Sequence, residues 1–423
     1  MVLVFGFTIK FGFYCLMVSS LSTSALGRHF TDIKGRVIEA EVIEVDGKQA
    51  KLKLAKNGKT YVVLLDTLSE PDREFLAQWG KITETHHHHA DDADPSKDSI
   101  QVSEGATAAM MTKYGLRENY DAKWPRLVSV DIGIEVEVVS EDEDKGEFVY
   151  HSPNYAFVCD VKLTKNVVKK FAVMFEATRE YCRLLPVSTM KAHLPGGEFR
   201  HKILLFEEQE AYLRNGGMPG SAGVFVSRGG NGVVMVPLTS LGVIKGKAGY
   251  RYDYDKSNKT LMHEIAHQVT DFEYLSSPGS RGWFSEGLAE YVAVTPYRSG
   301  KFMAGNTLDE IRDYVTAYGE KGRGGRALGE KFEAPDLKEY MLQPYESFTQ
   351  DANFNYGLGL LLTYYMFHME EDRTNVVAFL KALKEGKRGQ DALDALLNGR
   401  NYDQLEEQIA KAWKSRGVRI TFR

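Results

Sequence analysis

The pattern of hydrophobic and polar residues begins as a series of short β runs. Between residues 28 and 80, apolar side chains recur at about every second position in three stretches, which predicts strands. The three stretches are Arg36–Val45, Gln49–Leu54 and Lys59–Leu65. Asp46-Gly47 and Asn57-Gly58 separate them, and such dipeptides favour tight hairpin turns. With a short helix expected at Ser69–Trp79, region 28–80 is predicted to form a small β module.

From residue 125 onward, strand patterns alternate with longer amphipathic helices. The predicted strands are Leu127–Val139, Tyr155–Val161, Lys202–Phe206, Ala222–Ser227 and Val233–Pro237. The predicted helices of this part are Thr164–Leu185, Glu207–Arg214, Lys256–Thr270 and Trp283–Ala293. The last two strands form a glycine-linked hairpin just before helix 256–270. That hairpin either receives an extended peptide at its edge or is an ordinary part of the scaffold sheet.

Beyond Pro296 the pattern becomes almost wholly helical. The expected helices are Leu308–Tyr318, Pro335–Met341, Asn355–Met369, Thr374–Leu383, Asp391–Leu397 and Gln404–Arg416. A first half of strands and helices followed by a helical half indicates the α+β class. Residues 125–423 are therefore expected to form one domain with a cleft between its two halves.

Residues 81–124 lack apolar periodicity and are predicted to be a flexible linker. The linker contains His86–His89, which either bind a metal loosely or are solvated. Over the whole chain, 43% hydrophobic and 26% charged residues are values typical of a globular protein. The net charge of −5 and the absence of a long basic run argue against a nucleic-acid partner.

Residues 1–27 have the character of a secretory signal peptide. They are apolar and aromatic, carry a single charge at Lys10, and end in a plausible cleavage region at Ala25-Leu26-Gly27. The protein is thus expected to be secreted or periplasmic. Because apolar residues precede the charge, an uncleaved N-terminal membrane anchor is the alternative. No later segment is apolar over the ~18 residues of a membrane span, so none is expected after signal removal.

Two cysteines remain once the signal is removed, Cys159 and Cys182. In an exported protein two cysteines are able to pair as a disulfide. Two separately buried thiols are the alternative, and the spacing of the residues does not choose between them.

The strongest chemical motif is His263-Glu264-Ile265-Ala266-His267. Residues four apart share one face of a helix, so both histidines are able to reach one metal ion. Glu264 projects toward the same cleft and is able to act on a metal-bound water without being a ligand. Glu286 follows His267 by nineteen positions, which lets a second helix return and supply a carboxylate. Two histidines and a glutamate leave the fourth position open for water, as in a catalytic zinc site.

Two other carboxylates are alternatives for the third ligand. Asp271 and Glu273 lie close after His267, and the chain has little room to bring them back to the metal. Glu286 is therefore the preferred ligand. The plain alternative to the whole motif is a pair of surface histidines flanking an acid.

The spacing H-E-x-x-H, eighteen residues, then glutamate resembles the gluzincin metallopeptidases, the group that includes thermolysin and the zinc aminopeptidases. The run W-x-x-E-G-x-A-E-Y at 283–291 is similar to the aminopeptidase branch and its bacterial relatives. The resemblance covers roughly residues 150–415. It implies a thermolysin-like domain, a Zn²⁺ cofactor held by His263, His267 and Glu286, and Glu264 as the general base.

Two further roles follow from the same resemblance. Glu290, one helical turn after Glu286, would accept the free N–H of a liganding imidazole and fix its orientation. An exposed helix glutamate is the alternative. Tyr356, in Asn355-Tyr356-Gly357-Leu358-Gly359, would donate to the oxyanion of the transition state. A tyrosine of the core is the alternative there.

One departure from the aminopeptidase pattern narrows the function. That family carries a G-x-M-E-N stretch that helps bind the amino terminus of the substrate, whereas Gly230–Pro237 has no acidic residue. We therefore expect an exported zinc metallopeptidase that cleaves within peptide or protein substrates. An aminopeptidase is one alternative. A non-catalytic protein- or surface-binding protein on a peptidase-like scaffold is the other.

The β module at 28–80 resembles the Sla-homology module, a small SH3-like barrel of exported bacterial proteins. The resemblance rests on Phe30-Thr31-Asp32, Gly35-Arg36, Asp46-Gly47 and Leu68-Ser69-Glu70-Pro71-Asp72. It implies a protein or surface ligand for this module, with a β cap that binds nothing as the alternative.

Overall fold

The computed structural model describes two parts of the chain. Its residues are 28–33, 36–46, 48–54, 59–69, 72–73, 76, 113, 120 and 124–423, the last range without 195, 197–198, 220, 229–230, 248, 254–257, 278 and 318–324. The predicted signal peptide at 1–27, His86–His89 and most of the linker 81–124 lie outside the described residues. The chain divides into two compact units, Met1–Ser99 with Leu213–Ser221, and Ile100–Tyr212 with Ala222–Arg423. Helices and strands both occur, and the α+β class is confirmed.

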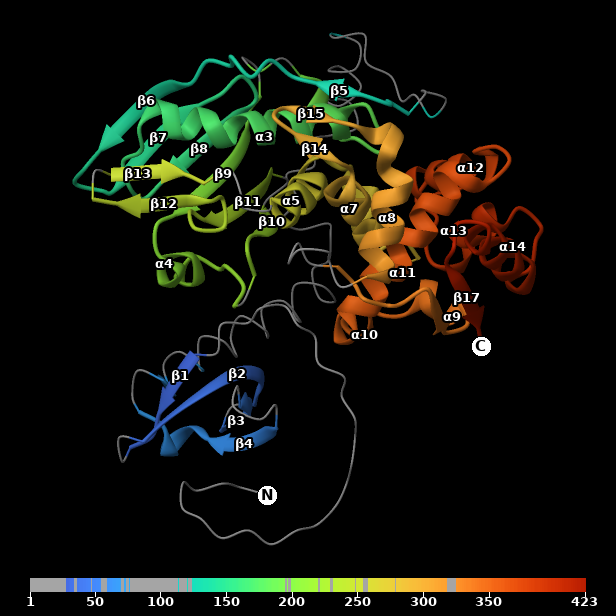
Figure 1. Cartoon of the computed structure of the whole chain (residues 1–423), viewed down its shortest axis with the longest axis horizontal. Helices are drawn as coiled ribbons and strands as arrows, with labels where there is room; N and C mark the ends of the chain where they lie inside the picture. The colour runs from blue at the N-terminus through green and yellow to red at the C-terminus, as the bar shows by residue number, and fades with distance from the viewer. Residues whose placement is uncertain are drawn as a thin grey trace, which may run out of the picture. The chain divides into compact units, whose positions relative to one another are not determined.

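The first unit contains a four-stranded antiparallel sheet in the order β1-β2-β3-β4 (Figure 1). The strands are β1 (Arg28–Thr31), β2 (Val37–Asp46), β3 (Gln49–Leu54) and β4 (Thr60–Leu64). Alternation along β3 buries Ala50 and Leu52 in a small core and leaves Lys51 exposed. The three predicted strands are confirmed, and β1 is an addition to them. Closure of this sheet into a barrel stays a prediction.

A six-stranded sheet in the order β10-β11-β9-β8-β7-β6 forms the framework of the second unit (Figure 1). Its strands are β6 (Glu137–Asp142), β7 (Glu147–His151), β8 (Tyr155–Cys159), β9 (His201–Phe206), β10 (Val224–Arg228) and β11 (Asn231–Pro237). β8 and β9 are parallel, so the chain must cross over between them, and helix α3 (Lys165–Arg183) lies in this crossover. The ring of Phe157 on β8 lies 5.2 Å from that of Phe171 on α3. The strand order leaves β10 and β6 as the two edge strands of the sheet.

The predicted strand Leu127–Val139 is wrong as a single element. The structure has only β5 (Val128–Ser129) and the start of β6 in this stretch. Between them the side chain of Asp131 accepts a hydrogen bond from the backbone N–H of Gly133 at 2.7 Å. Such a local bond turns the backbone and competes with strand pairing, which the apolar alternation alone did not show.

Helices make up most of the remainder. They are α4 (Gln209–Arg214), α5 (Lys259–Val269), α6 (Phe272–Ser276), α7 (Trp283–Val294), α8 (Thr307–Thr316), α9 (Leu337–Leu342), α10 (Tyr345–Gln350), α11 (Ala352–Tyr364), a π-helical turn (Tyr365–Met369), α12 (Thr374–Lys384), α13 (Gln390–Leu397) and α14 (Tyr402–Lys414). No helix of the described part has the length and apolar character needed to cross a membrane.

The expectation of an almost wholly helical second half needs correction, because short strands occur there too. They are β14 (Tyr297–Arg298), β15 (Lys301–Phe302), β16 (Lys331–Ala334) and β17 (Arg419–Phe422). β15 pairs with β5, and β17 pairs with β16. A further hairpin, β12 (Val243–Gly246) and β13 (Gly249–Tyr252), was also not predicted. Pairs of two to four residues are too short for a period-two pattern to stand out.

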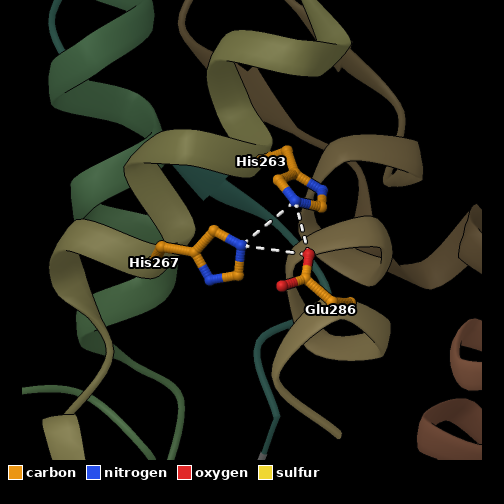
Figure 2. A group of neighbouring side chains, drawn as sticks. All are labelled: His263, His267 and Glu286. Carbon is orange, nitrogen blue, oxygen red and sulfur yellow. Dashed lines mark hydrogen bonds and ion pairs between the residues drawn. The ribbon is translucent and has the colours of Figure 1, made fainter. Parts of the chain in front are cut away.

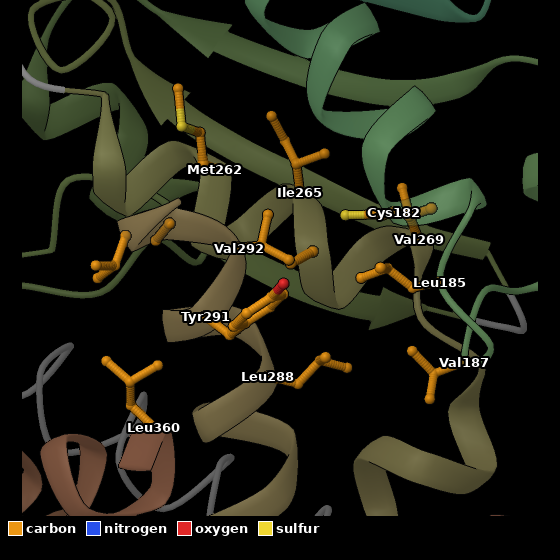
Figure 3. Close-up of a cluster of buried hydrophobic side chains, with 14 of the residues drawn as sticks. Cys182, Leu185, Val187, Met262, Ile265, Val269, Leu288, Tyr291, Val292 and Leu360 are labelled. Atoms are coloured by element: carbon orange, nitrogen blue, oxygen red, sulfur yellow. The ribbon is translucent and has the colours of Figure 1, made fainter. Parts of the chain in front are cut away.

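Part of the large core of the second unit lies around α5 and α7 (Figure 3). Met262, Ile265 and Val269 on α5 belong to the same buried cluster as Leu288 and Val292 on α7. On α5 these positions are spaced at three and four residues, which leaves another side of the helix to His263 and His267.

Two glycines bring α7 and α11 into direct backbone contact. A Cβ added to Gly287 would lie 2.3 Å from the carbonyl oxygen of Gly359. A Cβ added to Gly359 would lie 2.7 Å from the carbonyl oxygen of Trp283. No larger residue fits at either position without moving a helix, and this close approach sets the distance between the residues on α7 and those on α11.

Cys159 and Cys182 are both buried free thiols. Of the two alternatives the structure therefore contains separate thiols and not a disulfide. Burial raises the pKa of the Cys159 thiol to about 12, so it stays protonated and unreactive at neutral pH.

His201 makes the stability of the second unit depend on pH. It is 3% exposed, and burial followed by the charge of Arg179 lowers its pKa to about 3. An unfolded histidine has a pKa of about 6.5. Below that pH the unfolded chain takes up a proton that the folded chain refuses. Stability therefore falls as pH drops from about 6.5 toward 3, by at most about 1.4 kcal/mol per pH unit for this one group.

The expected result is a smaller acid sensitivity in a His201→Gln variant. Denaturant unfolding of variant and parent at several pH values between 8 and 4 measures it. The difference in unfolding free energy between the two should be constant above pH 7 and shift in favour of the variant below pH 6. Two parallel curves would show that His201 is not held neutral.

Candidate metal centre

Helices α5 and α7 bring three ligand atoms to one point (Figure 2). His263 Nε2 lies 3.1 Å from Nε2 of His267 and 3.1 Å from Oε2 of Glu286. His267 Nε2 lies 3.3 Å from the same oxygen. The three residues predicted as metal ligands are thus gathered into one cluster, and His263 and Glu286 are buried.

The spacing of these atoms suits a small tetrahedral cation. With bonds of about 2.0–2.2 Å, tetrahedral geometry places neighbouring zinc ligands about 3.3 Å apart. The observed separations of 3.1, 3.1 and 3.3 Å are close to this value. Two imidazole nitrogens and one carboxylate oxygen are also a donor set that zinc accepts. The residues present therefore fit the ion that the sequence resemblance implies.

The loop before α7 carries the chain back to α5. Gly282 has φ +92°, a conformation that favours glycine, and its backbone N–H donates to the hydroxyl of Ser285 at 3.0 Å. The indole N–H of Trp283 donates to the carbonyl of Gly279 at 2.7 Å. These bonds fix the first turn of α7, and Glu286 follows directly in that turn.

The histidines and glutamates of the cluster shift one another's pKa values. Burial opposes protonation of His263, but its hydrogen bonds to Glu286 and Glu290 outweigh burial and raise its pKa to about 10. Burial likewise opposes ionisation of Glu286, yet the neighbouring His267 and His263 hold its pKa well below the usual range. Buried carboxylates beside imidazoles create a negative potential, which a cation at the same point would neutralise.

Glu264 lies beside the three ligand residues without joining their cluster. Its Oε2 accepts the backbone N–H of Phe225, on the edge strand β10, at 2.8 Å. The ring of Phe225 stacks against that of His267 with centroids 6.4 Å apart. Burial raises the pKa of Glu264, while the two histidines act in the opposite direction. The structure thus places this carboxylate between the ligands and the sheet edge.

Glu290 contacts the far side of a ligand imidazole, as the resemblance implies. Its Oε1 lies 3.0 Å from Nδ1 of His263. Its other oxygen, Oε2, accepts from Arg326, with Nε at 3.1 Å and Nη2 at 2.8 Å. Sequence reasoning missed Arg326, because it lies in a glycine-rich stretch with no motif or period that would point to it.

Tyr356 lies against the cluster from α11. Its ring stacks on that of His263, with centroids 5.9 Å apart and planes 7° from parallel. Burial, followed by the charge of Glu286, raises the pKa of Tyr356 well above its usual range, so the phenol keeps its proton. A side-chain hydrogen bond joins it to Tyr345.

Tyr345 is a second tyrosine at the site, and it was not predicted. Its hydroxyl donates to Oε1 of Glu286 at 3.0 Å, and Arg281 Cζ lies 4.5 Å from its ring centre. It stands at the start of α10, a short helix that the sequence pattern did not reveal. The only sequence feature that points to Tyr345 is its place directly after Pro344.

The two alternative third ligands, Asp271 and Glu273, have a different partner. Asp271 Oδ2 is 2.6 Å from Lys384 Nζ, and Glu273 Oε2 is 3.7 Å from the same nitrogen. Both carboxylates pair with this lysine and not with the histidines, as their positions close to His267 suggested.

Comparison with known proteins identifies no relative of this chain. The chain matches no family model, no curated protein and no solved structure. Any function inferred for the chain therefore rests on the residues of this candidate site.

Proposed function

We propose that the protein is a zinc-dependent metallopeptidase. The observation that carries this proposal is the convergence of His263, His267 and Glu286 at the spacing of zinc ligands, with Glu264 beside them. A bound Zn²⁺ would supply Lewis acidity to a peptide carbonyl and lower the pKa of a water molecule. The chain's own residues would handle the protons.

Glu264 would act first as general base and then as general acid. It would take a proton from the attacking water and pass it to the nitrogen of the leaving amine. Its hydrogen bond from the Phe225 N–H holds one oxygen and leaves the other for this transfer. Tyr356 keeps its proton and lies against His263, so its hydroxyl is a suitable donor to the developing oxyanion.

The proposed fold, location and substrate class follow from the resemblance to the gluzincin metallopeptidases. We propose a gluzincin-like domain in the second unit and an exported location, secreted or periplasmic. Cleavage within peptides is favoured over aminopeptidase action, because Asn231–Pro237 of β11 brings no carboxylate for an amino terminus. Peptides and proteins are the proposed substrates.

The N-terminal sheet is proposed to be an SH3-like module that binds a protein or surface ligand. Ile33 and Val37 support this role, because these apolar side chains are 66% and 56% exposed. A protein in which this module is the only working part is the second candidate function.

One experiment tests the catalytic proposal and its alternative together. The purified protein is analysed for metal and then incubated with an unbiased peptide library, with and without a zinc chelator. We expect about one zinc per chain, cleavage at internal bonds, and loss of cleavage on chelation that added Zn²⁺ reverses. Absence of stoichiometric zinc, or cleavage that survives chelation, would contradict a zinc peptidase. Zinc without cleavage would favour the binding role.

A further inference from the structure

Arg326 contacts side chains on two of the three helices that carry the candidate site, α7 and α11. Its Nε and Nη2 atoms lie 3.1 and 2.8 Å from Oε2 of Glu290 on α7. Its Cζ atom lies 5.1 Å from the ring centre of Tyr356 on α11. The side chain is 17% exposed, so its charge is largely removed from water and depends on these partners.

Two hydrogen bonds hold the backbone of Arg326 in place. Its N–H donates to the carbonyl of Tyr314 near the end of α8 at 2.7 Å. Its own carbonyl accepts the side-chain N–H of Asn353, in the first turn of α11, at 2.7 Å. The guanidinium also lies over the ring of Tyr314, 5.6 Å from its centre. The position of the guanidinium is thus set by the fold and not by Glu290 alone.

We propose that Arg326 is the positioning residue of the metal centre, a role that rests on the proposed function. By occupying Oε2 of Glu290, it leaves Oε1 to meet Nδ1 of His263 at 3.0 Å. That contact turns Nε2 of His263 toward Glu286 and His267. The same guanidinium supports Tyr356, which covers the face of this imidazole. Arg326 therefore acts on the His263 ring in two ways, through Glu290 at the edge of the ring and through Tyr356 at its face.

The geometry requires arginine and not merely a positive charge. Two nitrogens of a planar fork meet one carboxylate oxygen while the plane stacks on tyrosine rings. Lysine has a single ammonium group and cannot make both contacts in the same way. Arg326→Lys therefore separates the effect of charge from the effect of positioning.

The test measures zinc affinity and not turnover. The dissociation constant is obtained by competition with a chromophoric chelator for the parent, Arg326→Lys, Arg326→Gln, Glu290→Gln and the double variant Glu290→Gln/Arg326→Gln. Losing the outer partner of a metal ligand typically weakens metal binding about 10–100-fold. We expect about 10-fold weaker binding for Arg326→Gln and a smaller loss for Arg326→Lys. Arg312→Gln is the control, since this arginine of α8 is 43% exposed and pairs with Asp313.

The double variant decides whether Arg326 acts through Glu290. If it does, the loss of zinc affinity in the double variant is smaller than the product of the two single losses, because both changes interrupt the same contact through Glu290. The double variant also removes both buried charges, so it remains informative if Arg326→Gln alone fails to fold. In Co²⁺-loaded protein, the visible spectrum should change for Arg326→Lys and stay unchanged for Arg312→Gln.

Two results would overturn this role for Arg326. One is parental zinc affinity together with a parental Co²⁺ spectrum in Arg326→Lys. The other is a double variant whose loss equals the product of the single losses. A parent that takes up no zinc would instead overturn the proposed function itself, and this role with it. The two failures are therefore distinguishable by the parent protein alone.

Discussion

Replacing Glu264 by glutamine is expected to lower the rate of peptide cleavage about 10²–10⁴-fold and leave zinc content unchanged. The amide has nearly the same shape and its oxygen still accepts the N–H of Phe225, so the local fold is kept. It cannot take a proton from water, and general-base catalysis contributes a factor of about this size. Steady-state cleavage of a peptide found in the library digestion, with metal analysis of the same sample, measures both effects.

Glu273→Gln is the matched control for that experiment. Glu273 lies on the neighbouring helix α6 and pairs with Lys384, so its neutralisation should leave cleavage unchanged. Cleavage at the parental rate in Glu264→Gln would show that this residue is not the base. Loss of zinc in the same variant would show that it acts as a ligand.

The second large effect is expected from Gly287→Ala. The new methyl group would lie 2.3 Å from the carbonyl oxygen of Gly359 and 2.5 Å from Oγ1 of Thr363, far inside contact distance. The backbone of α11 must therefore move away from α7. Overpacking of this kind costs about 1–3 kcal/mol, and we expect the upper end because backbone and not a flexible side chain is in the way. Unfolding by denaturant measures the loss.

Two further variants make this prediction specific. Gly305→Ala is the control, since its Cβ would meet nothing closer than 3.6 Å. Gly359→Ala should be destabilising as well, but the double variant should cost less than the sum of the two, because helices already pushed apart accept the second methyl. A stable Gly287→Ala protein with full activity would mean that the two helices do not need their close contact.

The grouping of His263, His267 and Glu286 was predictable because the sequence features behind it are local. His263 and His267 share a helix face by spacing alone, and the helix around Glu286 is indicated by a mostly apolar run after Gly282. The predicted helix Trp283–Ala293 differs from α7 by a single residue at its end. Hydrophobic periodicity is most informative for long buried helices of this kind.

Arg326 and Tyr345 could not be found in the same way. Each reaches the site from a loop or short helix far along the chain, and its role exists only through contacts with Glu290 or Glu286. A single sequence contains no record of such long-range pairs. The strand expected at Leu127–Val139 failed for a related reason, because one side-chain bond from Asp131 outweighed a favourable apolar pattern.

The contact between Gly287 and Gly359 has a consequence for how this sequence can diverge. Because each glycine makes room for backbone of the other helix, a change at one position alters what the other position accepts. The two should therefore vary together or not at all as related chains drift apart. The glycine directly after Glu286 and the glycine three residues after Tyr356 are then expected to be conserved or exchanged as a pair. The glycine pair would identify a distant relative even where the other residues on the surfaces of α7 and α11 have changed.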